Sequence, residues 1–194
     1  SVSVRTLKAM KAAGADAVKI QTYTPDTITI DCDLPAFKIK HCTLWDGQTL
    51  YSLYKKAYTP WEWQPKLKKL AEKLGLIFFS TPFDFTAVDF LEKMKVPAYK
   101  IASFEITDIP LIEYVASKGN PVFLATGVAR LEDIQEAVAA CRRVGNRKVV
   151  ILKCTSSYPA PYEDANLAVM ADLASRFVVI TGLADHTPGI AAPI

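Results

Sequence analysis

The sequence lacks the features that mark several large classes of protein. It contains no apolar run approaching the roughly 18 residues of a membrane span, and no charged-then-apolar leader. Neither sign of charge is in large excess, because 23 basic and 20 acidic side chains leave a net charge of +3. That balance argues against nucleic acid or a membrane surface as a partner. We therefore expect a cytoplasmic protein with neither kind of partner, whose mild positive bias suits anionic ligands.

Cysteine and histidine are both scarce. The four cysteines, at positions 32, 42, 141 and 154, share no CxxC spacing, which argues against a disulfide framework and suits a reduced compartment. His41, beside Cys42, lies in the insertion and is not a candidate for a functional role. The other histidine, His186, is a candidate for acid–base or metal chemistry, with a hydrogen-bonded structural role as the alternative.

Short apolar runs alternate with amphipathic helical stretches along the chain. The runs are near-continuous rather than strictly alternating, as in parallel strands covered by helices, and they span 17–23, 76–81, 98–105, 121–126, 148–156 and 177–183. Helical patterns lie between them at 86–95, 111–118, 131–144 and 166–176. Residues 24–58 form an insertion, after which Thr59 to Glu62 reads as a capping box that opens a helix, with Pro65 delaying or kinking it.

This order of elements favours a (β/α)8 barrel, which typically needs about 250 residues and eight strands. A doubly wound sheet is the alternative, weakened because no Gly-x-Gly-x-x-Gly follows the first run. The chain does not begin with Met, opens inside a helical pattern and stops where another helix is expected. We therefore expect 1–194 to be a single catalytic barrel domain, incomplete because the first and last strands are missing.

Polar side chains occur at the end of every predicted strand, which is where barrel enzymes carry their catalytic groups. Lysines, hydroxyls and a glycine turn on one rim describe a phosphate or carboxylate site, and an acid and a histidine remain for proton or metal work. The candidates are Lys19, Gln21, Thr81, Lys100, Ser103, Glu105, Thr126, Ser156, Tyr158, Asp185 and His186.

Each candidate also has a structural interpretation. A lysine at a strand end can extend to solvent, and a hydroxyl there can end a strand or cap a helix. Asp84 is as suited to capping the helix at 86–95 as to contacting a ligand, and Glu105 could be a surface carboxylate. Their occurrence at successive strand ends is what favours function.

The motifs together resemble the N-acetylneuraminate (sialic acid) synthase family over essentially the whole chain. The matching strings are VKIQTY at 18–23, STPFD at 80–84, YKIAS at 99–103, ATG at 125–127, YP at 158–159 and GLADHT at 182–187. The tryptophan-rich strings LWDGQTLY at 44–51 and AYTPWEW at 57–63 are similar to the pseudaminic acid synthase branch in particular.

The resemblance implies a metal-dependent condensation of phosphoenolpyruvate with an open-chain acetamido sugar, in the cytoplasm, by a homodimer when full length. It implies that phosphoenolpyruvate is held by Lys19, Thr81, Lys100, Ser103, Thr126 and Ser156. It assigns the sugar to Gln21, Tyr158 and Asp185, and catalysis to Glu105, His186 and Lys100. His186 would be one of two histidine ligands of Mn2+ or Mg2+.

Departures from the family pattern keep alternatives open. A glutamate on the first strand, the second metal histidine and a C-terminal antifreeze-like domain, all typical of the family, would lie outside this chain. Ala184 stands where serine is frequent, and Thr126 and Ser156 are substitutions at ligand positions. The alternatives are an N-acetylneuraminate or legionaminic acid synthase, or a non-catalytic barrel that binds an anion.

Overall fold

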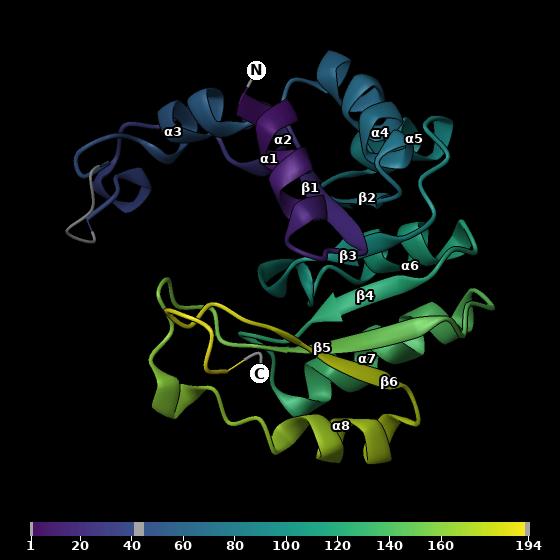
Figure 1. Ribbon diagram of the computed structural model, residues 1–194. Coiled ribbons are helices and arrows are strands. Elements are labelled where there is room, and N and C mark those ends of the chain that lie inside the picture. Colours follow the sequence, from purple (N-terminus) through teal and green to yellow (C-terminus); the bar gives the residue numbers. More distant parts are fainter. Residues whose placement is uncertain (1, 41–44, 193–194) are drawn as a thin grey trace. The chain divides into compact units, whose positions relative to one another are not determined.

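The computed structural model describes residues 2–40 and 45–192, so His41 and Cys42 lie outside the described residues. The chain divides into two compact units, Ser1–Val96 and Pro97–Ile194, each built of parallel strands and helices (Figure 1). Over the described ranges, no helix is long and apolar enough to cross a membrane. The cysteines described, at 32, 141 and 154, are free thiols, in agreement with the sequence prediction.

The first unit is a two-stranded parallel sheet with its helices. Its elements are α1 (Val2–Ala12), β1 (Ala17–Thr22), α4 (Gln64–Lys73), β2 (Ile77–Pro82) and α5 (Phe85–Lys93). Lys19 lies opposite Phe79 and Gln21 opposite Thr81 in the register of β1 and β2. Because successive side chains of a strand point to opposite faces, Lys19 and Gln21 share one face, while Val18 and Thr22 are buried on the other.

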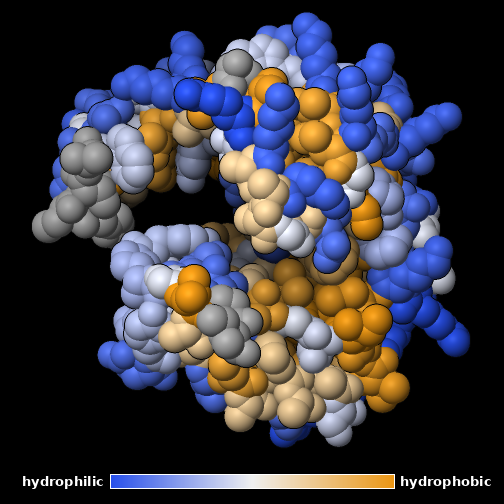
Figure 2. Space-filling model, in the orientation of Figure 1, coloured by the Kyte–Doolittle hydropathy of each residue, from blue (hydrophilic) through white to orange (hydrophobic). Residues whose placement is uncertain are grey.

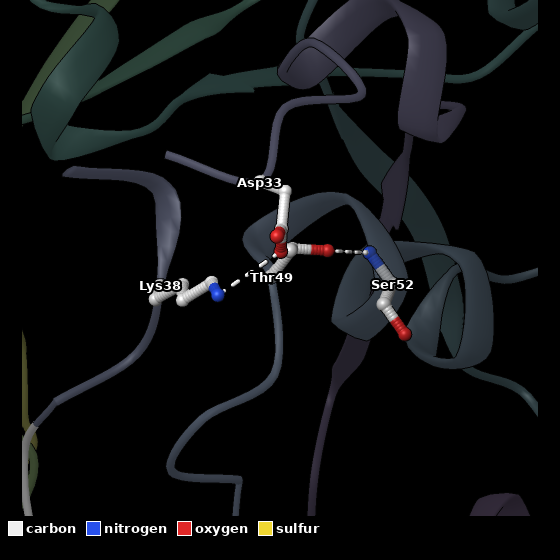
Figure 3. Close-up of polar contacts among 4 residues, drawn as sticks. All are labelled: Asp33, Lys38, Thr49 and Ser52. Carbon is white, nitrogen blue, oxygen red and sulfur yellow. Dashed lines mark hydrogen bonds and ion pairs between the residues drawn. The ribbon is translucent and has the colours of Figure 1, made fainter. Parts of the chain in front are cut away.

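The insertion at 24–58 folds as irregular chain around short helices. These are α2 (Pro25–Ile28), the 3-10 turn η1 (Pro35–Phe37) and α3 (Leu50–Ala57). The side chain of Thr49 caps α3 by accepting a hydrogen bond from the Ser52 amide at 3.1 Å. Nearby, Lys38 forms an ion pair with Asp33 at 3.2 Å (Figure 3). An isolated antiparallel bridge joins Lys38 to Thr49 and closes this segment.

The start of the next helix differs from the prediction. No capping box forms at Thr59; instead Pro60 precedes a 3-10 turn, η2 (Trp61–Trp63), without a side-chain cap. Regular α4 begins only at Gln64, with Pro65 in its first turn. Proline lacks an amide proton, which is tolerated in the first turn, where that proton would have no intrahelical partner. The predicted delay of this helix is therefore confirmed and the capping box was wrong.

The second unit is a four-stranded parallel sheet. Its strands are β3 (Tyr99–Ile101), β4 (Val122–Ala125), β5 (Val149–Cys154) and β6 (Ile180–Ala184), paired in sequence order. The helices α6 (Ile109–Ser117), α7 (Leu131–Arg143) and α8 (Val169–Phe177) follow β3, β4 and β5, and α8 packs against β5 and β6. Apolar surface gathers over the part of this unit where β5 and β6 lie (Figure 2).

Two predicted strands have different bounds in this unit. The run at 98–105 is a strand only to Ile101, after which a 3-10 turn, η3 (Ser103–Glu105), begins. The run at 177–183 loses its first residues, because Phe177 ends α8 and Val178 adopts a left-handed conformation with φ of 52°. Both differences shorten strands at a turn, and neither changes the order of the elements.

Candidate active site

The loops that follow the four strands of the second unit bring their polar side chains together. The Gly127 amide, after β4, donates a hydrogen bond to the Ser103 hydroxyl, after β3, at 3.2 Å. Ser103 Oγ in turn lies 3.5 Å from Cys154 Sγ, at the end of β5. Cys154 Sγ lies 3.8 Å from His186 Nδ1, after β6. Parallel strands end at one edge of their sheet, which is why four separate sequence motifs meet here.

Gly127 is the position where the backbone approaches this cluster most closely. A β-carbon there would lie 2.1 Å from Ser156 Oγ, 2.9 Å from Ser103 Oγ and 3.2 Å from Cys154 Sγ. All three distances are shorter than ordinary van der Waals contact, and at the first two the hydroxyls would have to move to admit a side chain. Glycine is therefore required here for space, which matches the glycine turn predicted at the end of this strand.

The polar side chains of this region fall into two groups, those with a hydrogen-bond partner in the described part of the chain and those without one. Those of Ser103 and Thr126 already have protein partners, since Thr126 Oγ1 donates to the Leu152 carbonyl at 3.1 Å. In contrast, Ser156 Oγ and Glu105 Oε2 are buried and have no hydrogen-bond partner among the described residues. A buried polar group without a partner costs free energy, so these two atoms are suited to contact a ligand.

Lys100 and Glu105 place a cation and an acid within electrostatic reach of each other. Burial lowers the pKa of the Lys100 ammonium, and negative charge on Cys154 and Glu105 partly opposes that change. Burial raises the pKa of the Glu105 carboxyl, opposed by a hydrogen bond from its own backbone and by the Lys100 charge. Burial is the largest cause of both shifts, and partly buried titratable groups at strand ends are candidates for contact with a ligand.

His186 is held on three sides. Its Nδ1 lies 2.8 Å from the Thr155 carbonyl oxygen, and the Ala160 amide donates to the His186 carbonyl at 2.8 Å. The Tyr158 ring lies against the imidazole with the ring centroids 4.2 Å apart. A carbonyl oxygen only accepts, so Nδ1 carries a proton, and the neutral ring has its lone pair on Nε2. That tautomer fits a metal ligand or a base.

The described residues contain no group of three or more His, Cys, Asp or Glu that could hold a metal ion. His186 is therefore a single candidate ligand. Its neighbour Asp185 has a local role, because its Oδ1 accepts from the amide and the hydroxyl of Thr187, each at 2.9 Å. These hydrogen bonds, led by the one from the Thr187 amide, lower the pKa of Asp185. Its predicted contact with a sugar stays a prediction.

Lys19, Gln21 and Thr81 lie in the first unit. Thr81 is fully buried, and its hydroxyl has no hydrogen-bond partner among the described residues. Asp84 caps α5 through Oδ1, which accepts from the Ala87 amide at 3.0 Å, while its Oδ2 is buried without a described partner. The structural interpretation of Asp84 is thus confirmed, and the roles of the first three residues stay predictions.

The tryptophans in and just after the insertion differ in environment. Trp61 donates to the Tyr23 carbonyl at 3.1 Å and packs on Phe90 with the ring centroids 4.8 Å apart. Trp45 and Trp63 are 48% and 50% exposed. Trp61 therefore packs against other residues of the first unit, whereas Trp45 and Trp63 present apolar surface to solvent.

A model of the NeuB family matches residues 6–194. The chain belongs to the NeuB family. Among its relatives, a pseudaminic acid synthase of Helicobacter pylori is 47% identical over 194 residues, covering 100% of this chain and 57% of that protein. An N,N'-diacetyllegionaminic acid synthase of Legionella pneumophila is 37% identical, covering 95% of this chain and 53% of that protein. The NeuB chain thus spans about half the length of these relatives, and the resemblance drawn from its motifs is confirmed.

A solved structure gives the fold of the same family. The crystal structure of an N-acetylneuraminic acid (sialic acid) synthetase from Leptospira borgpetersenii, in complex with citrate, has a TM-score of 0.86 and 29% sequence identity. It covers 99% of the NeuB chain, which covers 62% of that structure. This likeness supports the barrel-type α/β class predicted from the strand pattern.

Sequence reasoning missed two residues of the NeuB site region. Cys154 was not among the candidates, although its position at a strand end was the same signal that identified Ser156. Lys153 was not considered, yet it is 9% exposed and has two hydrogen bonds in the loop beside His186. A charged residue in an apolar run was the available signal, as it was for Lys100.

Proposed function

We propose that this NeuB-family chain forms the catalytic domain of a nonulosonic acid synthase, which condenses phosphoenolpyruvate with an open-chain acetamido sugar and releases phosphate. The observation that carries the proposal is the set of unsatisfied buried atoms on the site residues. Ser156 Oγ and Glu105 Oε2 have no described partner, and they lie in the strand-end region that also holds the half-buried Lys100. A polar ligand with acceptors for Lys100 and Ser156 and a donor for Glu105 would satisfy them.

Phosphoenolpyruvate suits the basic part of this region. Its phosphate and carboxylate need donors, which the Lys100 ammonium and the Ser156 hydroxyl supply through charge-assisted hydrogen bonds. The Ser103 hydroxyl is held by Gly127 and Cys154, so it contributes mainly by shaping the site.

Glu105 and His186 suit the condensation itself. Carbon 3 of phosphoenolpyruvate forms a bond to the aldehyde carbon, whose oxygen takes up a proton. Water then adds at carbon 2, losing a proton, and the carbon–oxygen bond to phosphate breaks. Burial raises the pKa of Glu105, which makes this carboxyl the candidate to exchange these protons. His186, through Nε2, would be one ligand of a divalent cation, which would supply Lewis-acid polarisation of the aldehyde oxygen.

Pseudaminic acid is the product we infer. Greater identity to a pseudaminic than to a legionaminic acid synthase favours it. A non-catalytic anion-binding barrel is the alternative of another class, but it has no use for a carboxyl with a raised pKa or for an oriented imidazole.

The test is phosphate release by the intact protein. Phosphoenolpyruvate should be consumed only with an acetamido sugar and a divalent metal present, and EDTA should abolish turnover. In competition, the diacetamido-trideoxy-altrose precursor should be used in preference to N-acetylmannosamine. Equal or better use of N-acetylmannosamine would overturn the pseudaminic assignment, and binding of phosphoenolpyruvate without any turnover would favour the non-catalytic alternative.

A further inference from the structure

Lys153 is a buried cation that the proposed reaction does not use. It lies on β5 directly before Cys154, which belongs to the strand-end cluster formed with Ser103, Gly127 and His186. Because successive side chains of a strand alternate, Lys153 points to the opposite face from this cluster. Its ammonium donates to Thr155 Oγ1 at 2.7 Å and to the Asp164 carbonyl at 2.9 Å. Both acceptors are neutral oxygens. A buried ammonium is costly unless its donors are satisfied, so these contacts fix the side chain in one place.

The Thr155 hydroxyl completes a triangle of hydrogen bonds with these groups. It accepts from Lys153 and donates to the Asp164 carbonyl at 3.0 Å. Asp164 belongs to the 3-10 turn η4 (Tyr162–Asp164), ten residues along the loop between β5 and α8. Lys153 therefore ties both ends of one loop segment, 155 and 164, to the strand that carries it.

The other side of Thr155 faces the imidazole. The Thr155 carbonyl oxygen lies 2.8 Å from His186 Nδ1. The same loop segment supplies the Ala160 amide to the His186 carbonyl, and the Tyr162 hydroxyl donates to the Pro188 carbonyl. The direction of the Thr155 carbonyl thus depends on the loop that Lys153 holds, and the protonated ring nitrogen of His186 depends on that carbonyl.

We propose that Lys153 is a positioning residue for His186: through Thr155 it holds the carbonyl that keeps the proton on Nδ1 and the lone pair on Nε2. The proposal rests on the proposed function for the use of that lone pair, which is metal binding. Orienting partners behind a ligating histidine typically change metal affinity by about 10- to 100-fold. Lys153 acts one contact further away, so we expect an effect near the lower end.

Two variants and two controls test this in the intact protein. Lys153→Met removes the ammonium and keeps the stem, and Thr155→Val removes the hydroxyl and keeps the carbonyl. Lys148→Met is the matched control, because Lys148 lies before the other end of β5 and its ammonium donates to the Gly119 carbonyl at 3.1 Å. Thr155→Ser keeps the hydroxyl and should behave as wild type, so the pair Thr155→Val and Thr155→Ser still tests the proposal if Lys153→Met fails to fold.

The readouts are the nitrogen NMR shifts of the His186 ring in metal-free protein, assigned with His186→Gln, and the affinity for Mn2+ alone. We expect Lys153→Met and Thr155→Val to increase the share of Nε2–H tautomer and weaken Mn2+ binding about tenfold, with both controls unchanged. Wild-type tautomer and affinity in both variants would overturn the proposal. If His186→Gln binds Mn2+ as tightly as wild type, the metal role in the proposed function fails, while the tautomer still decides the role of Lys153.

Discussion

The Gly127 amide donates to the Ser103 hydroxyl at 3.2 Å, so the turn after β4 rests directly on the side chain after β3. This contact leaves no room for a side chain at 127, because a β-carbon would lie 2.1 Å from Ser156 Oγ and 2.9 Å from Ser103 Oγ. Both hydroxyls belong to the region that we assign to phosphoenolpyruvate. The backbone of one strand end thus sets the position of side chains from two others.

Gly127→Ala should therefore weaken both substrate binding and the fold. The added methyl group forces the Ser156 hydroxyl away, and we expect the KM for phosphoenolpyruvate to rise at least about tenfold, with overpacking costing about 1–3 kcal/mol of stability. Gly182→Ala is the control, because its β-carbon would meet only Leu152 Cδ2, at 3.2 Å. Steady-state kinetics and thermal melting of both variants check this, and a normal KM in Gly127→Ala would contradict it.

Ser156→Ala should raise the KM for phosphoenolpyruvate at least about tenfold. A hydrogen bond to a charged group contributes about 1.5–3 kcal/mol, and Ser156 Oγ has no described protein partner to compete for it. The neighbouring Ser157 is the control, since its hydroxyl is exposed and donates to the Pro159 carbonyl at 3.1 Å. If Ser157→Ala changes the KM as much as Ser156→Ala, the effect comes from the loop and not from the Ser156 hydroxyl.

Lys100 should set an alkaline limit on substrate binding. Burial lowers the pKa of its ammonium below the ordinary 10.5, so the charge is lost at a lower pH than for an exposed lysine. We expect the KM for phosphoenolpyruvate to rise at a pH below 10.5, and Lys100→Ala to show a KM at least about tenfold higher at neutral pH. Lys100→Arg stays charged and should lose this alkaline rise. An identical alkaline profile in Lys100→Arg would assign the limit to another group.

Glu105→Gln should abolish turnover and yet stabilise the fold. Burial raises the pKa of this carboxyl from 4.5, so the folded state binds the proton more tightly than the unfolded state. Stability from this group is fully present below the unfolded pKa and is lost as the pH rises through the folded one. The Tm of Glu105→Gln should exceed that of wild type at pH 7, with the difference disappearing below about pH 4. Glu136→Gln, exposed on α7, should change the Tm little; a lower Tm for Glu105→Gln would mean that Glu105 is a structural ion-pair partner.

The strand order and much of the site region follow from the sequence. Apolar β-branched runs located β1 and β5, and strand-end polarity located Ser103, Ser156 and His186, because burial and topology act on residue type. Local caps were harder to predict. Phe177 suits a strand by composition, yet it ends α8 because Val178 turns the chain through a left-handed conformation.

The hydrogen-bond partner of each polar side chain, and the face to which it points, could not be predicted in the same way. Thr126 and Ser156 look alike in sequence, but only one has its proton committed to a backbone carbonyl. Lys100 and Lys153 both interrupt apolar runs. Which lysine faces the strand-end cluster depends on the pleat of its strand and on the loop that covers it, both of which are properties of the folded chain.

The most direct test of the central claim follows the bridging oxygen of phosphoenolpyruvate. The intact protein would be incubated with Mn2+, the diacetamido-trideoxy-altrose precursor and phosphoenolpyruvate that carries 18O between carbon 2 and phosphorus. The masses of both products would then be measured by mass spectrometry. The account predicts one nonulosonic acid per phosphate, with all of the label in the phosphate. Unlabelled phosphate, or phosphate without a condensed sugar acid, would contradict it.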